Sequence, residues 1–444
     1  MKNNLKTKIT LVALIGMLVS AGVAMAGNNC PSVTALKSCT NDIFYSNHAP
    51  ITKELIAMVE HNSDLKFLLE KSIAMAKKIN PDKDPNPAQS LEEYYDYIDW
   101  ASKAMPWEIL PCAGKRYAKI YDSIGQSLGY FYFLNDMLLP ELEGKGLYRN
   151  SVQYMEPYRS WMVNFIAQYG FYLDTPESWN NDCYERAKLD KSFGLDDDTY
   201  ESPKNWHSFN DFFSRRLSSP DKRPIASPDD RSVLASPADS QPQGIWKINK
   251  KNHFEHHKNV DIKSRDFTSV EQLLADSAYK GAFAGGILTH TYLDTNDYHH
   301  YHFPVSGVIK EVKIIGGDDA AGGTVTWLPD KKRYRFKPAL TGWQMIETRG
   351  LVVIDTDEYG LVAVLPVAMC QISSVVFAES VKVGAVVKKG DRMGCFRFGG
   401  SDVVMVFQKG IKLNLTVPQN SNGEYEHINA CSQYGVLSNG KSQR

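Results

Sequence analysis

Four prolines near the middle of the chain separate two halves with different hydrophobic patterns. Pro220, Pro224, Pro228 and Pro237 rule out a continuous helix, because proline lacks the amide hydrogen and clashes with the preceding turn. Before them apolar residues recur at helical spacing, and after them short β-branched runs alternate with Gly, Asp and Asn turns. We therefore expect an α+β protein, in which a helical N-terminal accessory domain precedes a β-rich domain built as a sandwich or partial barrel.

The N-terminal half carries specific helix signals. Ser90 and Glu93 are spaced as in a capping box, and apolar residues follow them at helical spacing. The stretch 117–139 is rich in Tyr, Leu and Phe, and the stretch 158–173 places large aromatic residues at helical spacing. Such stripes are more often packed core than ligand pocket. We assign residues 30–190 to the accessory domain.

Residues 200–444 form the second predicted domain. It is expected to begin with an amphipathic helix at 206–217, and one more helix is expected at 269–279. Strands are predicted at the β-branched runs 305–315, 322–328, 333–337, 351–355, 361–365, 372–377 and 403–407.

The first residues have the three parts of a secretory signal. Three lysines precede the apolar run 9–23, and Ala24-Met25-Ala26 closes it, which predicts a signal peptide at 1–26 and cleavage after Ala26. The mature protein is then expected to be exported, either to the periplasm or to the medium. An exported chain can form disulfides, and Cys30 with Cys39 is the most local candidate pair among seven cysteines.

Composition excludes some functions. With 43% hydrophobic and 23% charged residues the chain can bury a large core, and a formal net charge of −1 gives no electrostatic reason to expect nucleic acid as a partner.

The run His253-Phe254-Glu255-His256-His257 fits neither common zinc-protease spacing, and there is no C-x-x-C, so we expect no metal site.

Gly399-Gly400-Ser401 lies between two apolar runs and is expected to form a tight bend between strands. The two glycines leave the Gly400 carbonyl open to attack by the Ser401 hydroxyl. Such an attack would move the acyl chain from nitrogen to oxygen and then break the chain. A bulge in an ordinary strand is the alternative interpretation of an isolated Gly-Gly-Ser.

Two other polar stretches favour the chemical interpretation. Asp239 ends Ser236-Pro237-Ala238-Asp239, and the run 297–302 carries three histidines. Asp, His and Ser form the set needed to deprotonate a hydroxyl, with the carboxylate fixing the imidazole tautomer. In an extended segment His300 and His302 share one face and His299 takes the other, so the choice among them stays open.

These residues carry a resemblance to a known family. In chain order, five stretches resemble motifs of the phosphatidylserine decarboxylase family: 209–217, 223–225, 236–239, 297–307 and 389–401. The resemblance covers roughly residues 200–412. The helical segment 40–180 looks like the accessory domain of some members, including a soluble branch that acts on free tryptophan.

The resemblance implies a self-processing, pyruvoyl-dependent decarboxylase, made as a zymogen. By similarity, Asp239 and His302 activate Ser401, and the chain is cut between Gly400 and Ser401. This gives a β chain and a 44-residue α chain whose first residue is a pyruvoyl group made from Ser401. That group would form a Schiff base with the substrate amine and act as electron sink. His299 matches the first motif histidine, a candidate to contact the substrate carboxylate or supply a proton afterwards.

Three positions depart from the family pattern. Asp402 stands where Thr or Ser is usual after the cleaved serine, and Ser240 and Ala368 each stand where glycine is usual. None of them removes a residue of the implied triad. Together they raise the alternatives of slow maturation or an altered substrate.

Three functions therefore compete. The first is conversion of phosphatidylserine to phosphatidylethanolamine, with peripheral membrane contact through Phe209, Phe212 and Phe213. The second is decarboxylation of a free, aromatic amino acid such as tryptophan, which the accessory domain favours. The third is an uncleaved, inactive binding protein, which Asp402 favours. Assembly into a homo-oligomer is left open.

Overall fold

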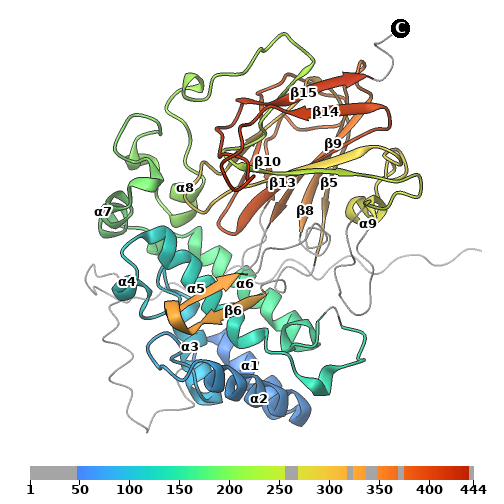
Figure 1. The fold of residues 1–444 in the computed structure, drawn as a ribbon. Helices are drawn as coiled ribbons and strands as arrows, with labels where there is room; N and C mark the ends of the chain where they lie inside the picture. The colour runs from blue at the N-terminus through green and yellow to red at the C-terminus, as the bar shows by residue number, and fades with distance from the viewer. Residues whose placement is uncertain are drawn as a thin grey trace, which may run out of the picture.

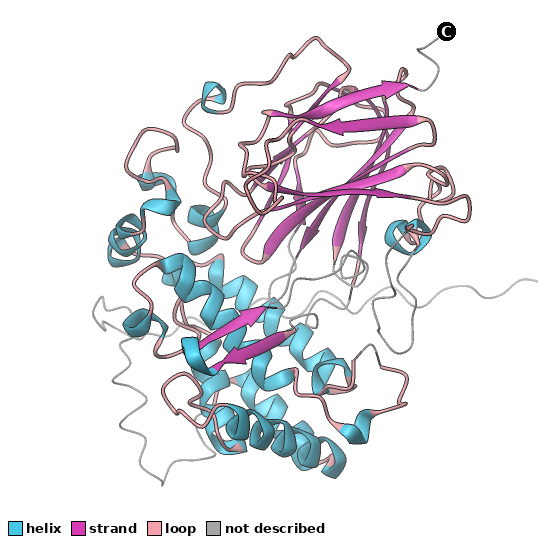
Figure 2. Cartoon of the chain, viewed as in Figure 1, coloured by secondary structure: helices cyan, strands magenta, loops and turns pink. Residues whose placement is uncertain are grey.

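The computed structural model describes residues 48–147, 149–255, 269–317, 324–336, 348–368 and 375–439. The predicted signal peptide and the Cys30–Cys39 pair lie outside these residues. Helices dominate the N-terminal part and several β-sheets the C-terminal part, as Figures 1 and 2 show, so the expected α+β class is confirmed.

The helical part forms where the aromatic periodicity predicts it. Its helices are α1 (Pro50–Glu60), α2 (Ser63–Ile79), α3 (Leu91–Ala101), α4 (Ala113–Arg116), α5 (Ile120–Asn135), α6 (Tyr158–Leu173), α7 (Asn181–Leu189) and α8 (Phe209–Phe213). The Ser90 hydroxyl accepts a hydrogen bond from the Glu93 amide (3.1 Å) and begins α3 as its N-cap. In α6 the buried Trp161, Phe165 and Tyr169 stack in succession, which confirms that the aromatic stripe is core.

The predicted helix at 206–217 is much shorter in the structure. Ser208 caps α8, but the chain leaves helical geometry at Ser214, and Leu217 instead pairs as a β-bridge with Tyr200. The side chains of Phe209, Phe212 and Phe213 are at most 2% exposed, packed in the helical core. These phenylalanines therefore do not form an exposed membrane-facing surface.

The largest sheet has seven antiparallel strands. In spatial order they are β11 (Val386–Val387), β5 (Gly307–Ile315), β8 (Arg349–Asp355), β9 (Leu361–Ala368), β13 (Gly400–Phe407), β3 (Ile287–Tyr292) and β2 (Gln241–Lys247). β8, β9 and β13 are nearly continuous apolar runs because both faces of the sheet are covered.

Two three-stranded sheets lie against one face of the large sheet (Figure 1). One contains β1 (Val233–Ala235), β15 (Gln433–Asn439) and β14 (Ile411–Leu415), and the other contains β10 (Val375–Phe377), β12 (Arg392–Phe396) and β4 (His300–His302). Side chains from both layers meet in an apolar cluster that we call the inner core, with members such as Val352, Met405, Tyr434, Tyr301 and Phe396. Of the two predicted architectures, this face-to-face packing is that of a sandwich.

The opposite face of the large sheet carries a second apolar cluster, which we call the outer core. It joins Leu288, Leu365 and Val404 of the sheet to α9 (Val270–Leu274) and nearby loops. Because alternate residues of β13 point to opposite faces, Val403 lies in the inner core and Val404 in the outer core.

A hairpin from the C-terminal half completes the helical core. β6 (Val325–Leu328) and β7 (Arg333–Phe336) pair with each other and lie among the helices in Figures 1 and 2. Tyr334 exchanges two backbone-to-side-chain hydrogen bonds with Gln126 of α5 (2.6 and 2.9 Å). The two halves of the sequence thus interlock, and the C-terminal half cannot be separated from the helices at a single linker.

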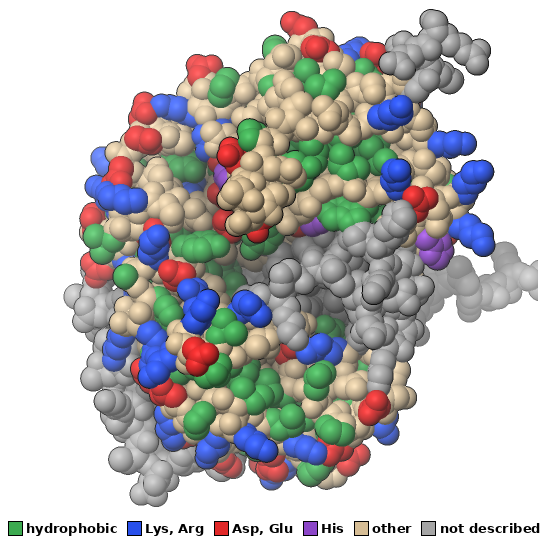
Figure 3. Space-filling model, viewed as in Figure 1, with side chains coloured by type: hydrophobic (Ala, Val, Ile, Leu, Met, Phe, Trp, Pro, Cys, Tyr) green, Lys and Arg blue, Asp and Glu red, His purple; other side chains and the backbone are tan. Residues whose placement is uncertain are grey.

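On the face shown in Figure 3, acidic and basic side chains are interspersed, in keeping with the near-zero net charge. Within the described ranges, we find no helix both long enough and apolar enough to span a bilayer.

Candidate active site

The backbone brings the three predicted site stretches to one end of the large sheet. Tyr292, at the end of β3, is paired on one side with Gln241 and on the other with Asp402. Asp239 lies two residues before Gln241, and Ser401 lies one residue before Asp402. With neighbouring strands about 4.8 Å apart, the two segments lie two strands, or about 10 Å, from each other.

The histidine run joins the same end through β4. The amide of His302 donates to the carbonyl of Pro237 (2.7 Å), which ties β4 to the turn that carries Asp239. On its other side β4 pairs with β12, and the Phe396 amide donates to the carbonyl of His299 (2.8 Å). Because Phe396 ends β12 five residues before Ser401, the same strand links the histidines to the predicted cleavage site.

The Asp239 carboxylate is buried and strongly held. Arg223 donates to it twice, from Nε to Oδ1 (2.8 Å) and from Nη2 to Oδ2 (2.5 Å), and the Ala430 amide also donates to Oδ1 (2.7 Å). Burial acts to lower the pKa of Arg223, but its hydrogen bonds and attraction to Asp239 outweigh burial and raise it. Arg223 therefore fixes the position and orientation of the Asp239 carboxylate in the site. Sequence reasoning quoted Arg223 only as part of a motif and missed this role.

His302 is oriented by groups other than Asp239. Its Nδ1 donates to the carbonyl of Gly390 (2.9 Å), and its Nε2 accepts from the Tyr298 hydroxyl (3.3 Å). Burial lowers the pKa of His302, partly offset by the Gly390 bond and the charge of Asp239. The imidazole is thus neutral, with its lone pair on Nε2. The tautomer that we expected Asp239 to fix is set by the Gly390 carbonyl, and Asp239 contributes through its charge.

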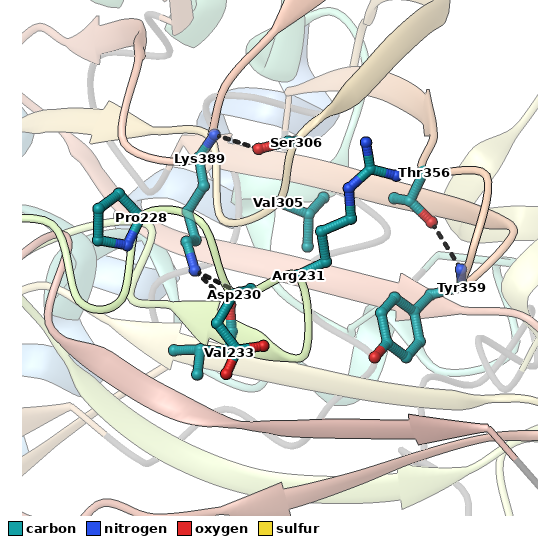
Figure 4. A pocket seen from close by; sticks show the side chains of 9 residues that line it. All are labelled: Pro228, Asp230, Arg231, Val233, Val305, Ser306, Thr356, Tyr359 and Lys389. Carbon is teal, nitrogen blue, oxygen red and sulfur yellow. Dashed lines mark hydrogen bonds between the residues drawn. The ribbon is translucent and has the colours of Figure 1, made fainter. Parts of the chain in front are cut away.

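Lys389 anchors the turn that contains Gly390, whose carbonyl orients His302. Its buried ammonium donates to the backbone carbonyls of Ser227 (2.7 Å), Asp230 (2.8 Å) and Val233 (3.0 Å), as Figure 4 shows in part. Burial lowers the pKa of Lys389. The residue lies beside a small open pocket, yet its hydrogen bonds identify it as a clamp for the turn that contains Gly390.

The two ring nitrogens of His299 differ in their hydrogen bonding. Its Nδ1 donates to the carbonyl of Asp297 (2.9 Å), whereas no hydrogen-bond partner for Nε2 is found in the described part of the chain. The ring is 1% exposed and stacks on Phe213 with centroids 3.8 Å apart, and Phe213 in turn contacts Phe398. Burial, followed by the nearby charge of Arg215, holds the pKa of His299 well below its usual value. His299 is therefore a neutral base in an apolar wall, and its Nε2 lone pair has no partner within the described residues.

His300 is structural by comparison. Its Nε2 donates to the carbonyl of Ser214 (2.8 Å), and its Nδ1 accepts from Arg392 (3.1 Å). Burial lowers the pKa of His300 to about 3. The rings of His300 and His302 both pack on Tyr298, which confirms that they share one face of the strand.

Ser401 is the extra residue of a β-bulge. In the pairing of β13 with β9, Gly400 lies opposite Ala368 and Asp402 opposite Val367, so that Ser401 has no counterpart. Bulges occur next to active sites because they re-aim a residue out of the regular ladder. A strand bulge at Gly-Gly-Ser is thus compatible with the interpretation of the same residues as a cleavage site.

Comparison with known proteins decides the family. The family model for phosphatidylserine decarboxylase matches residues 209–429. A phosphatidylserine decarboxylase proenzyme of Saccharophagus degradans is 30% identical over 229 residues, which are 47% of this chain and 71% of that protein. The chain belongs to the phosphatidylserine decarboxylase family. It is therefore a member of a family of carboxy-lyases that are generally pyruvoyl-dependent and made as proenzymes.

Other relatives cover different shares of the chain. The decarboxylase iboD of Amanita muscaria is 29% identical over 284 residues, 58% of this chain and 78% of that protein. Phosphatidylserine decarboxylase proenzyme 3 of Schizosaccharomyces pombe is 33% identical over 208 residues, 46% of this chain, but the match spans only 19% of that much longer protein.

The departures from the family pattern are accommodated by their neighbours. The Ser240 hydroxyl accepts from Thr291 (2.7 Å) and donates to the carbonyl of Ala238 (3.1 Å). Ala368 is fully buried directly opposite Gly400. The carboxylate of Asp402 is fully buried and accepts from Nδ1 of His290 (3.0 and 3.2 Å). Sequence reasoning missed His290, whose signal is a single histidine in the apolar run of β3.

A second imidazole–carboxylate pair joins the exposed His427 to the buried Asp297 of the phosphatidylserine decarboxylase motif. Nε2 of His427 lies 3.0 Å from Oδ1 of Asp297. The hydrogen bond to Asp297 raises the pKa of His427, while burial raises the pKa of Asp297. No group of three or more potential metal ligands occurs among the described residues, and part of the run 253–257 lies outside them.

Proposed function

We propose that this protein is a self-processing, pyruvoyl-dependent decarboxylase that cuts itself between Gly400 and Ser401 and converts phosphatidylserine to phosphatidylethanolamine. Family membership supports the reaction class. The observation that carries the site is His299, a buried neutral imidazole whose Nε2 lacks a partner among the described residues, three sequence positions from the motif base His302. An orphaned buried nitrogen is costly unless a ligand engages it.

The self-processing step balances with water alone. The Ser401 hydroxyl attacks the Gly400 carbonyl, the C–N bond breaks, and an ester joins the two segments. Loss of the Ser401 Cα proton breaks the Cβ–O bond and frees the Gly400 carboxylate. The remaining enamine becomes an imine, which water hydrolyses to the ketone and ammonia. His302, neutral and with its lone pair on Nε2, is the base that takes the hydroxyl proton, and Asp239 stabilises the imidazolium that forms.

The residues present fit the decarboxylation chemistry. A pyruvoyl group at position 401 would supply an electron sink for the loss of CO₂ from an amino substrate. An amino substrate arrives as an ammonium, and Nε2 of His299 is the acceptor for its proton. The same nitrogen returns a proton to the substrate carbon after CO₂ has left. Phe213 and Phe398 exclude water beside it, which favours loss of the carboxylate charge.

A free amino acid is the second candidate substrate, as expected from the accessory domain. One observation favours it. The three phenylalanines of α8 are buried and so do not offer a lipid-facing surface.

Two measurements test the proposal. Intact-mass analysis of the purified protein should show an α chain of about 5 kDa that is about 17 Da lighter than residues 401–444 with a free serine, because an amino alcohol has become a ketone. CO₂ release should then be measured from phosphatidylserine vesicles and from free amino acids, tryptophan among them. Turnover of an amino acid without the lipid would assign the second substrate, and a single uncut, inactive chain would support the binding protein instead.

Export, contact with a membrane surface and self-association remain parts of the proposal that rest on the sequence. Recovery of the mature chain with Gly27 as its first residue from a periplasmic or culture fraction would support export. Co-sedimentation with vesicles and the mass of the assembly in solution test the other two.

A further inference from the structure

We propose that the buried His290–Asp402 pair holds the new end of the α chain, the residue made from Ser401, in register after the Gly400–Ser401 bond is broken. This inference rests on the proposed function, because it concerns the chain end that self-cleavage creates. His290 and Asp402 act as positioning residues in it.

The pair is buried and closely bonded. Asp402 is 0% and His290 7% exposed, and both carboxylate oxygens lie within 3.2 Å of Nδ1 of the imidazole. The indole of Trp246 from β2 stacks on the His290 ring with centroids 4.8 Å apart. The three side chains therefore tie the start of β13 to β3 and β2.

The location of the pair makes it specific for one register. Asp402 shares the outer-core face with Val404, and His290 shares it with Leu288. If β13 slipped by one residue, the carboxylate would turn toward the inner core and lose His290. Removing one partner of a buried ion pair is strongly destabilising, so the pair penalises the slip.

Cleavage makes this restraint necessary. Before the cut, Ser401 is a bulged residue that is flanked by the Gly400–Ala368 and Asp402–Val367 pairings. After the cut the covalent link to Gly400 is gone, and residue 401 becomes a chain end, where strands fray. The first side chain that can anchor the new end is then Asp402, one residue away.

The pair acts through the backbone. It lies on the outer-core face of the sheet, whereas Tyr301 of the histidine strand packs in the inner core on the opposite face. A group on the far face can hold residue 401 in place without touching the substrate. We therefore expect it to affect turnover with little effect on substrate binding.

The experiment compares His290→Leu/Asp402→Leu, which keeps the site buried and apolar, with the wild type. Apolar replacement of both partners of a buried pair is often tolerated, so the double variant is expected to fold and to be cut. We expect its kcat to fall roughly tenfold with KM within about twofold. In the cut double variant, the backbone amides of residues 402–406 should exchange hydrogen faster than in the cut wild type. When Ser401→Ala keeps the chain whole, the double substitution should not speed up this exchange.

The controls separate this inference from the proposed function. His48→Leu breaks a comparable imidazole–carboxylate pair with Asp99 in the helical part and should leave kcat and exchange in 402–406 unchanged. His290→Leu alone leaves the buried Asp402 carboxylate without its imidazole partner and should be more destabilising than the double substitution. Equal kcat and equal exchange in the cut wild type and the cut double variant would overturn the inference. An uncut wild type, seen by intact mass, would overturn the proposed function and this inference together.

Discussion

Two buried carboxylates, on opposite sides of the large sheet, are held in different ways. Asp239 lies on the inner-core side, where Arg223 and a backbone amide bind it beside His302. Asp402 lies on the outer-core side and is bound by one imidazole. A guanidinium keeps its charge at any physiological pH, whereas an imidazole is a weaker and directional partner. The first arrangement provides a fixed charge for chemistry, and the second fixes the position of a strand.

The comparison requires that the bond before Ser401 is cut, because Asp239 acts in the cutting and Asp402 holds the chain end that the cut creates. Replacing Ser401→Ala removes the attacking hydroxyl, so the chain should stay whole and release no CO₂ from any substrate. A gel, intact mass and a radiolabelled CO₂ assay check this outcome. Turnover by the uncut variant would show that the pyruvoyl mechanism is wrong.

His299 should separate processing from catalysis on the inner-core side. His299→Asn removes the free Nε2, which the cleavage step does not use. We expect normal cutting and a kcat lower by about 10²- to 10⁴-fold, the usual contribution of a general acid or base. Single-turnover CO₂ release with the cut protein measures it, and His300→Gln, which alters a structural neighbour, is the matched comparison. A parallel loss of cutting and turnover in His299→Asn would mean that this residue belongs to the processing base.

Arg223→Met tests whether Asp239 depends on its guanidinium. Among the described residues it leaves the buried carboxylate with the Ala430 amide as its remaining partner, and it should cost about 3–5 kcal/mol of unfolding free energy. Cutting should slow as well, because Arg223 no longer holds the Asp239 carboxylate in the position from which it stabilises the His302 imidazolium. Urea unfolding and a time course of cleavage measure the two effects. The double variant Arg223→Met/Asp239→Leu should recover stability but not cutting, and recovery of both would remove Asp239 from the mechanism.

Acid should lower the stability of the protein through the buried, neutral histidines on the inner-core side. With the pKa of His300 lowered to about 3, the unfolded chain binds the extra proton between about pH 6.5 and 3, so stability falls as pH falls through that window. One such histidine contributes roughly 1.4 kcal/mol per pH unit there. Urea unfolding of the Ser401→Ala protein and of its His300→Gln derivative should give curves that converge below pH 6.5 and run parallel above about pH 7. Parallel curves throughout would contradict the assignment.

Local pattern predicted much of this structure, but not the partners inside the site. The aromatic stripe of α6, the capping residue Ser90 and strands such as β5, β8 and β9 follow from residues close in sequence. Short strands such as β1, β4 and β11 were not predicted, because their pairing partners are distant in the sequence. The α8 helix came out shorter than expected, since the chain after Ser214 turns away to pair with the segment around Tyr200. His302 is oriented by the Gly390 carbonyl, and Asp402 is bound by His290 over a hundred residues earlier. Such contacts depend on strand register, which one sequence does not reveal.

The smallest expected effect concerns Ser240, which departs from the family pattern on the Asp239 side. Its hydroxyl bonds Thr291 and the Ala238 carbonyl within the first turn after the motif. Ser240→Gly loses both bonds and leaves the Thr291 hydroxyl without this acceptor, at a cost of about 1–2 kcal/mol of unfolding free energy. Cutting and kcat should stay within about twofold, since neither Asp239 nor His302 loses a contact. A large loss of cutting at little cost in stability would show that the turn itself tunes Asp239, and the two sides of the sheet would then differ less than proposed.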